Sequence, residues 1–172
     1  MTLLNRVGDL LSTASVPHAL IGAAALAVRG IARSTFDIDL LTTDTRVLRD
    51  DWWTPLIVDD VTVDVRRGDA DDPLAGVVRI TTPGERPVDL VVGRHAWQTR
   101  AVERAERMAG GPPVVTALDL ILLKLYAGGA QDIWDVRELL RQPGAEDLPT
   151  SVEAELTTLP EPMRAVWSDV ER

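Results

Sequence analysis

The sequence predicts an α+β domain, with a mixed and mostly antiparallel β-sheet in the first 95 residues and helices after it. Two observations lead to this prediction. Short β-branched segments with alternating polarity recur up to residue 92, and the later segments repeat their apolar residues every three or four positions, as helices do. Clusters of Gly, Pro and Asp separate the segments and mark the turns between them.

The first elements alternate between helix and strand. Leu3, Val7 and Leu10 have helical spacing. From Phe36 onward, apolar residues alternate with acids, as in a strand with one face in a core. We therefore expect a helix over 2–12, a strand over 18–21, a turn at Gly22, a helix over 23–29 that ends at Gly30, a strand over 36–41 and a short helix over 45–53.

Three β-branched runs follow and predict an antiparallel set of strands over 56–65, 77–81 and 87–92. The segment GGPPVV, residues 110–115, breaks the pattern and is a candidate for a last short strand. Thr116 and Asp119 have capping-box spacing before a run that is apolar almost all round and should be buried. We expect helices over 95–108, 118–126, 131–141 and 151–171, the last interrupted around Pro160 and Pro162.

The bulk composition bounds the class of protein. The 172 residues suit one core over residues 1–110 with a helical region over 111–172 packed on it. No apolar run approaches the roughly 18 residues that cross a bilayer, and Asp9 interrupts any signal-like layout, so we expect a cytoplasmic protein. With no cysteine and only His18 and His95, any metal must be held mainly by oxygen.

The net charge of −9 opposes nonspecific binding to nucleic-acid phosphates or anionic lipid, so we expect no long nucleic acid and no membrane as partner. The exception would be a basic patch made by Arg100, Arg104 and Arg107 on one predicted helix. A solvated helix face is the simpler interpretation of these three arginines.

Gly22 connects a predicted strand to the start of a helix. Such a start offers free backbone N–H groups and the positive end of the helix dipole, and glycine lets a phosphate approach the backbone. Strand–Gly–helix turns are common, so this feature alone is a weak indication of an anion site.

Three acidic residues in apolar strands are candidates for a metal cluster. Asp37 and Asp39 on one strand would have their carboxylates on the same face, about 6.5–7 Å apart at Cα. Their mutual repulsion is a cost that a divalent cation offsets, although a solvent-exposed strand edge is the ordinary interpretation of such a pair. Asp89 and Asp64 both sit in apolar strands, and spacing alone does not decide which would complete the cluster.

Lys124 lies inside the apolar helix, where an ammonium needs an anionic partner. An ion pair with Asp132 or Asp135 of the next helix is one interpretation, and contact with nucleotide phosphates is the other.

The segment HALIGAAALAVRGIARSTFDIDLL, residues 18–41, resembles the signature of the DNA polymerase β-like nucleotidyltransferases. That signature is an apolar strand, a Gly-Gly or Gly-Ser pair, a spacer, and Asp-x-Asp on a strand. The segments RPVDLVVG, 86–93, and DLILLKLYAGGAQDIWDVREL, 119–139, resemble the small bacterial abortive-infection and stand-alone members of that group. The resemblance covers roughly residues 18–141.

The resemblance implies the nucleotidyltransferase fold, with residues 1–110 as the catalytic core. It also implies a set of site residues. Asp37 and Asp39 would bind Mg²⁺ or Mn²⁺, and Asp89 would complete one metal site and help to deprotonate the acceptor. The nucleotide-binding residues it implies are Gly22, Ala23, Arg33, Ser34 and Lys124.

The activity implied is metal-dependent transfer of a nucleoside monophosphate from an NTP, such as ATP, to a hydroxyl of a tRNA, a protein or a small molecule, with release of pyrophosphate. One residue departs from the pattern: Ala23 replaces the family's Gly or Ser and lacks its hydroxyl. The alternative is therefore a catalytically silent module of this fold that binds a protein partner, for instance within a toxin–antitoxin pair. A glycosyltransferase with Asp-x-Asp is disfavoured, because its donor domain is longer.

Overall fold

The computed structural model of the chain describes residues 1–58, 60–108 and 110–170. Its contacts divide the chain into two compact units. The first contains residues 1–25 and 33–115, and the second contains residues 26–32 and 116–172. The boundary between the units thus follows Val115, and residues 26–32 belong to the helical unit. The sequence predicts a boundary after residue 110.

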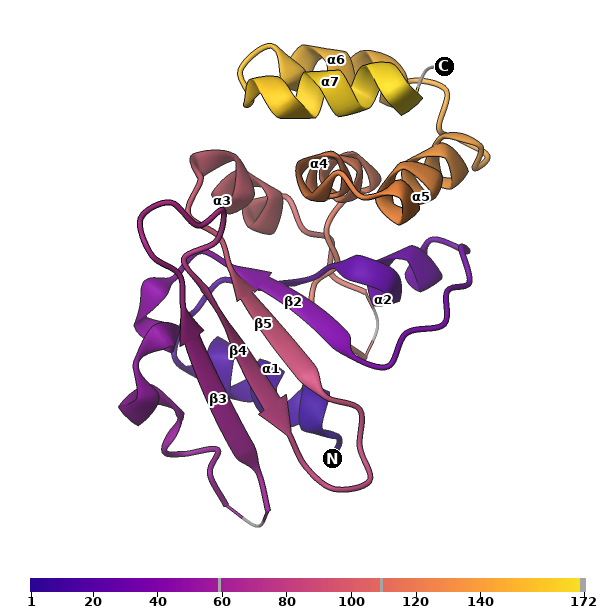
Figure 1. Cartoon of the computed structure of the whole chain (residues 1–172). Helices are drawn as coiled ribbons and strands as arrows, with labels where there is room; N and C mark the ends of the chain where they lie inside the picture. Colours follow the sequence, from indigo (N-terminus) through magenta and orange to yellow (C-terminus); the bar gives the residue numbers. More distant parts are fainter. Residues whose placement is uncertain (59, 109, 171–172) are drawn as a thin grey trace. The chain divides into compact units, whose positions relative to one another are not determined.

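The first unit contains a five-stranded sheet (Figure 1). Its strands are β1 (Ala19–Leu20), β2 (Ile38–Thr42), β3 (Thr62–Arg67), β4 (Gly76–Thr81) and β5 (Val88–Val92). They are arranged in the order β1-β2-β5-β4-β3, and every neighbouring pair is antiparallel except β2 and β5, which are parallel. The predicted α+β class with a mixed, mostly antiparallel sheet is therefore confirmed.

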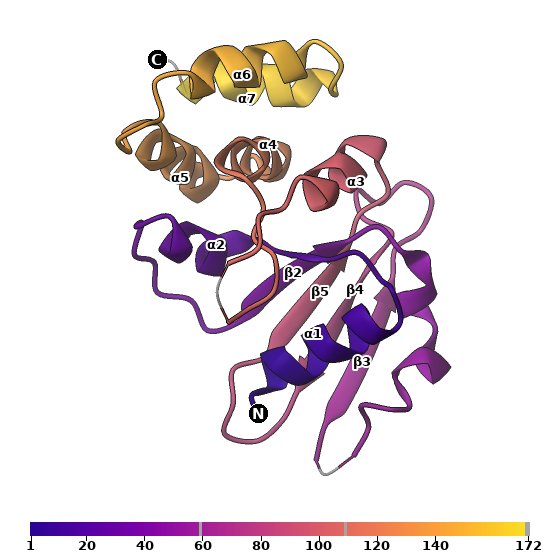
Figure 2. The same cartoon turned by 180° about the vertical axis from the view of Figure 1, so that it is seen from behind.

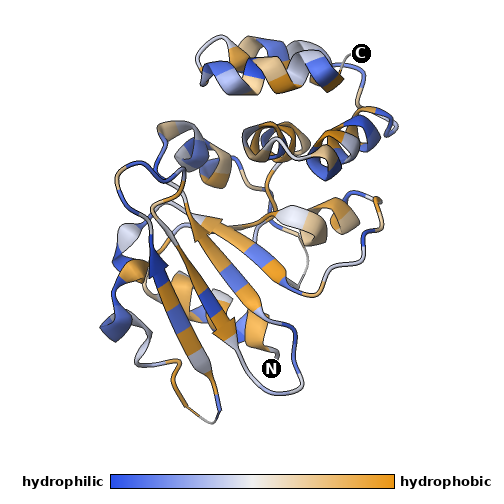
Figure 3. Ribbon diagram, viewed as in Figure 1, coloured by the Kyte–Doolittle hydropathy of each residue, from blue (hydrophilic) through white to orange (hydrophobic). Residues whose placement is uncertain are grey.

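Strands β4 and β5 bury every second residue. Val78, Ile80, Val88, Leu90 and Val92 have almost no exposed surface, whereas the residues between them are partly exposed. The alternation appears as bands of colour along the strands in Figure 3. Helix α1 (Leu3–Thr13) crosses the face of the sheet that is turned away in Figure 1 and toward the viewer in Figure 2. The sheet thus has one face in a core, as two-period strands require.

Several strand boundaries differ from the prediction. The predicted strand 56–65 begins instead at Thr62, and its residue Asp59 lies outside the described residues. The predicted strand 36–41 begins at Ile38, and Phe36 is 77% exposed, so the alternation there does not indicate a buried face. Residues 110–115 form no strand, but Val114 makes isolated bridges to Leu20 and Glu106.

The remaining helices of the first unit are short. Residues 45–53 form two 3₁₀ helices, η1 (Thr45–Leu48) and η2 (Asp50–Trp53). Helix α3 (Ala96–Glu103) ends five residues before the predicted end at Met108, and Arg104 caps it. Arg107 therefore lies beyond the helix, so Arg100, Arg104 and Arg107 are not spaced along one helix as the patch interpretation assumed.

The second unit is helical. It contains α4 (Ala117–Ala127), α5 (Ala130–Leu140), α6 (Leu148–Leu156) and α7 (Glu161–Val170). The predicted cap at Thr116 is present, because its Oγ1 accepts a hydrogen bond of 3.1 Å from the Asp119 amide. Gly128 ends α4 in the left-handed conformation, with φ of 68°. None of the helices in the described part of the chain is long and apolar enough to span a membrane.

Candidate active site

Charged residues from four neighbouring strands lie in one row across the sheet. Asp64 of β3 is paired in register with Arg79 of β4, Arg79 with Asp89 of β5, and Asp89 with Asp39 of β2. Neighbouring strands lie about 4.8 Å apart, and residues in register share a face of the sheet. Three acids and one arginine therefore share one face of the first unit.

Arg79 joins two of the predicted metal ligands. Its Nη1 lies 2.7 Å from Oδ2 of Asp89 and 3.6 Å from Oδ2 of Asp37. Asp37 itself precedes β2, and its backbone oxygen accepts hydrogen bonds from Thr35 Oγ1 at 3.0 Å and Arg86 Nη2 at 2.8 Å. These contacts hold the Asp37 backbone beside the start of β5 and bring its carboxylate near that of Asp89.

Asp89 is more enclosed than Asp37 and Asp64, because its side chain is 15% exposed, compared with 33% for Asp37 and 51% for Asp64. Its Oδ1 is buried and has no hydrogen-bond partner among the described residues. Burial raises the pKa of the Asp89 carboxyl, the charge of Asp37 raises it further, and Arg79 only partly opposes this. Oδ2 of Asp89 thus pairs with Arg79, whereas Oδ1 has no hydrogen bond within the described part of the chain.

Gly22 packs directly against Asp39. The Ile21 amide donates a hydrogen bond of 2.9 Å to the Asp39 backbone oxygen, which extends the pairing of β1 with β2. Gly22 then begins α2 (Gly22–Val28) with φ of +62°, and a β-carbon at this position would lie only 2.3 Å from Oδ2 of Asp39. Glycine is required here both for the backbone conformation and for the space it leaves to the carboxylate.

The same geometry separates the two candidates for a third ligand. Asp89 lies on the strand next to Asp39 and contacts Arg79, which also reaches Asp37. Asp64 lies on the edge strand, with β4 between it and β5, and pairs with Arg66 at 2.8 Å. This arrangement favours Asp89 over Asp64, and the role of either residue stays a prediction.

Within residues 1–58, 60–108 and 110–170, no three His, Cys, Asp or Glu side chains are placed so that they could hold one metal ion. The candidate carboxylates are instead bridged by a guanidinium, since Arg79 contacts Asp37 and Asp89. Binding of a cation by these residues would therefore require side chains to rearrange.

The predicted nucleotide-binding residues are distributed over both units. Ala23 follows Gly22 in α2, and Arg33 and Ser34 lie in the irregular segment before Asp37, within the first unit. Lys124 lies on α4 of the second unit.

The ammonium of Lys124 is engaged by two carboxylates. Its Nζ lies 2.8 Å from Asp132 Oδ1 and 2.9 Å from Asp135 Oδ2, and the Asp135 side chain has no exposed surface. Both ion-pair partners suggested by the sequence are therefore present together. A role of Lys124 at a nucleotide stays a prediction.

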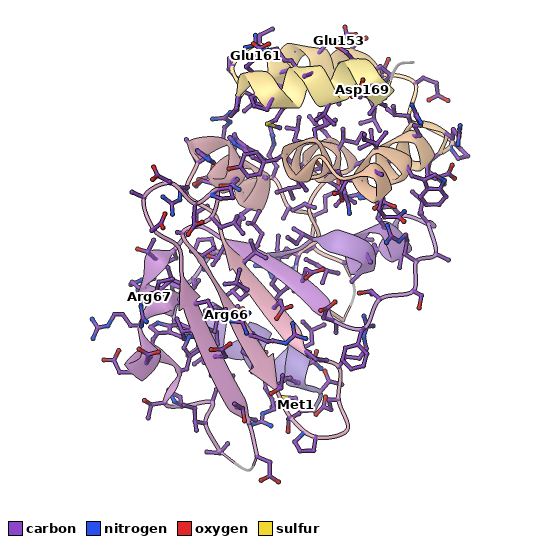
Figure 4. The ribbon with its side chains drawn as sticks, in the orientation of Figure 1. Met1, Arg66, Arg67, Glu153, Glu161 and Asp169 are labelled. Carbon is purple, nitrogen blue, oxygen red and sulfur yellow. The ribbon has the colours of Figure 1, made fainter. Side chains whose placement is uncertain are left out.

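A cavity of about 370 Å³ adjoins Asp89 on the side away from β2. Its wall comes from β3, β4, the turn between them and Asp89. The lining residues used below are Arg66, Asp72, Leu74, Val77, Arg79 and Asp89. Arg66 and its neighbour Arg67, which also lines the cavity, are labelled in Figure 4. The cavity combines apolar side chains with charged groups, as small-molecule sites do.

Arg79 is the site residue that sequence reasoning missed. The signal was available, because Arg79 is a charged residue inside the apolar run VVRIT, just as Asp89 is in PVDLVV. Sequence alone does not show that these two strands are adjacent or which of their residues are in register.

Comparison with known proteins supports the fold. No protein-family model and no curated protein matches the chain. The solved structures that it resembles include the crystal structure of ANT(2'')-Ia in complex with adenylyl-2''-tobramycin, at 18% identity and a TM-score of 0.59, with 90% of this chain and 95% of that chain covered. A solution structure of the antibiotic-resistance factor ANT(2'')-Ia gives the same identity and TM-score, with 90% of each chain covered.

A third solved structure, terminal uridylyl transferase 4 from Trypanosoma brucei with bound GTP, is 12% identical with a TM-score of 0.37, over 80% of this chain and 48% of that chain. At 18% identity, the likeness to the two ANT(2'')-Ia structures concerns the fold alone. The ANT(2'')-Ia structures show that the chain has the nucleotidyltransferase fold.

Proposed function

From the nucleotidyltransferase fold of this chain, we propose that it transfers a nucleoside monophosphate from an NTP to a hydroxyl group of an acceptor and releases pyrophosphate. The observation that carries the proposal is that Gly22, at the start of α2, packs against Asp39 of β2, which is in register with Asp89 of β5, and that Arg79 joins Asp89 to Asp37. We also infer that the chain is a small stand-alone enzyme of the abortive-infection type, on the motifs in residues 18–41 and 86–93.

The chemistry of the donor set suits a divalent cation, and the side chains would have to rearrange to surround it. Asp37, Asp39 and Asp89 offer carboxylate oxygens, the ligands that Mg²⁺ and Mn²⁺ prefer, and Oδ1 of Asp89 is buried without a partner among the described residues. These three residues would hold the metal. When bound, paired divalent ions stabilise the negative charge that develops on the attacking and leaving oxygens of an in-line displacement.

The two sides of the carboxylate row suit different parts of the reaction. On the side of β1, Gly22 leaves the backbone open to an anion, and the amide of Ala23 remains a donor although the family's hydroxyl is missing. We place the triphosphate there, with Arg33 and Ser34 as further contacts. On the side of β4, the cavity beside Asp89 is left for the acceptor.

Asp89 is suited to accept the proton of the acceptor hydroxyl. It lines the cavity left for the acceptor, so its carboxylate adjoins the space that an acceptor hydroxyl would occupy. In the balanced reaction the acceptor oxygen bonds to the α-phosphorus, the bond from that phosphorus to pyrophosphate breaks, pyrophosphate leaves with the electron pair, and the proton passes to Asp89.

The size of the cavity favours a small hydroxyl compound as acceptor. About 370 Å³ lies in the range of small-molecule pockets, roughly 300–1,000 Å³, and the mixed lining with Leu74 and Val77 provides an apolar surface for it. A tRNA end or a protein side chain would have to enter the same cavity with only its terminal group.

The test is calorimetric titration of each NTP with the protein in Mg²⁺ and in a chelator. Wild type should bind at least one NTP only when Mg²⁺ is present, and Asp37→Ala should abolish this binding. Asp51→Asn is the matched control, because it removes an exposed acid that pairs with Arg49 and is not one of the candidate ligands, and it should bind as wild type does. If wild type shows no metal-dependent binding, the silent protein-binding module becomes the better interpretation.

A further inference from the structure

Arg79 places a positive charge beside two of the candidate metal ligands, Asp37 and Asp89. It lies on β4, between Asp64 and Asp89 in the row, and its side chain is 37% exposed. One nitrogen, Nη1, contacts both Asp89 at 2.7 Å and Asp37 at 3.6 Å. A single guanidinium thus faces two of the three carboxylates assigned to the metal.

Three acids close together would repel one another if nothing compensated them. Asp39 and Asp89 are in register on adjacent strands, and Asp37 and Asp89 lie near enough for Nη1 of Arg79 to contact both carboxylates. Placing like charges together in a partly buried site is unfavourable unless a cation offsets it. Arg79 supplies such a cation from within the chain.

A metal ion and Arg79 would compete for the same two carboxylates. Nη1 of Arg79 contacts Oδ2 of both Asp37 and Asp89, so these two oxygens would be available to a cation held between the residues only after the guanidinium moves away. The cavity that Arg79 lines offers room for its side chain to move away from the carboxylates without entering the core.

We propose that Arg79 is a built-in counter-ion that neutralises Asp37 and Asp89 while no metal is bound, and that a divalent cation displaces it from Asp89. This inference rests on the proposed function, since it assumes that the three acids bind the metal. The opposite role, in which Arg79 stays on Asp89 and holds it in position for the metal, makes the opposite prediction.

The experiment measures the binding of Mn²⁺ alone, without nucleotide. The electron paramagnetic resonance signal of free Mn²⁺ reports binding to wild type, Arg79→Gln, Arg79→Lys and Arg49→Gln. Arg49 forms an exposed ion pair with Asp51, which is not one of the cluster acids, so its variant controls for the lost charge. A charge-assisted hydrogen bond corresponds to at least about tenfold in an equilibrium constant. Arg79→Gln should therefore bind Mn²⁺ about tenfold more tightly than wild type, and the other two variants should stay near wild type.

Thermal unfolding separates this role from a structural one. Without metal, Arg79→Gln should unfold at a lower temperature than wild type, because its carboxylates are uncompensated, and saturating Mn²⁺ should remove most of the difference. An equal loss of stability with and without Mn²⁺ would show that Arg79 acts only as a packing or positioning residue, and the proposal would be wrong.

A measurement on wild type keeps the proposal testable if Arg79→Gln does not fold. The Nε–H resonance of Arg79, assigned from its loss in Arg79→Lys, should shift when Mg²⁺ saturates the protein, and that of Arg49 should not. No shift at saturation would overturn the proposal. If neither wild type nor Arg79→Gln binds Mn²⁺, the metal site and the proposed function are wrong as well. If both proteins bind Mn²⁺ equally, or the variant binds it less tightly, only the inference about Arg79 is wrong.

Discussion

Replacing Gly22 by alanine should abolish Mg²⁺-dependent nucleotide binding. The new β-carbon would lie 2.3 Å from Oδ2 and 3.1 Å from Cγ of Asp39, so the carboxylate must turn away from its position beside Asp89. In addition, an alanine at φ of +62° costs roughly 1–2 kcal/mol. For a chain of this size that cost lowers the melting temperature by about 2–8 °C.

Gly84→Ala is the matched control for the backbone cost. Gly84 has φ of +78°, and an added β-carbon there would meet no atom of the described residues within 4 Å. Both variants should lose the stability that corresponds to the backbone cost, Gly22→Ala should lose more because of its contact with Asp39, and only Gly22→Ala should lose calorimetric binding of NTP with Mg²⁺. If Gly22→Ala binds nucleotide as tightly as Gly84→Ala does, Gly22 and Asp39 do not belong to the nucleotide site and the reasoning is refuted.

Further predictions concern the helical unit. Lys124→Met should lower the free energy of unfolding by about 3 kcal/mol in a urea titration, because it leaves Asp135 buried without its cation, and an unchanged midpoint would contradict this ion pair. Burial lowers the pKa of Lys124, but its hydrogen bonds to Asp132 and Asp135 outweigh this and raise the pKa overall. The stability that these two hydrogen bonds confer should be complete below the ordinary lysine pKa of about 10.4 and should fall as the pH rises above it. Urea titrations from pH 9 to 12 should show this decline in wild type and not in Lys124→Met. Thr116→Ala should cost about 1 kcal/mol through loss of the cap on the Asp119 amide, whereas Thr116→Ser should keep most of it in the same assay.

Local patterns account for most of the elements that the sequence predicts correctly. The alternation in PVDLVV and VVRIT specifies β5 and β4 because every second residue must enter the core, and Thr116 marks the start of α4 through its cap. The sequence predicts an end of α3 that is too late, since residues 104–108 contain no Gly or Pro to mark the stop.

The assembly of the candidate site depends on contacts that local patterns do not contain. The spacing of Asp37 and Asp39 predicts that they act together, and the apolar strand around Asp89 makes it a candidate, but Asp64 has the same local pattern. What distinguishes Asp89 is the parallel pairing of β5 with β2, which is set by packing between distant segments. The contact of Arg79 with the acids depends on the same register, so no local signal could reveal it.

The parallel pair also has a consequence for how the protein is made. Asp39 and Asp89 are some fifty positions apart, and both β3 and β4 are synthesised between them. Joining such distant segments costs loop-closure entropy before the new pairing repays it, whereas β3 with β4 and β4 with β5 are hairpin neighbours that can form quickly. We expect the acids to meet late in folding, so a nascent chain still on the ribosome cannot sequester cations in this cluster until β5 has emerged.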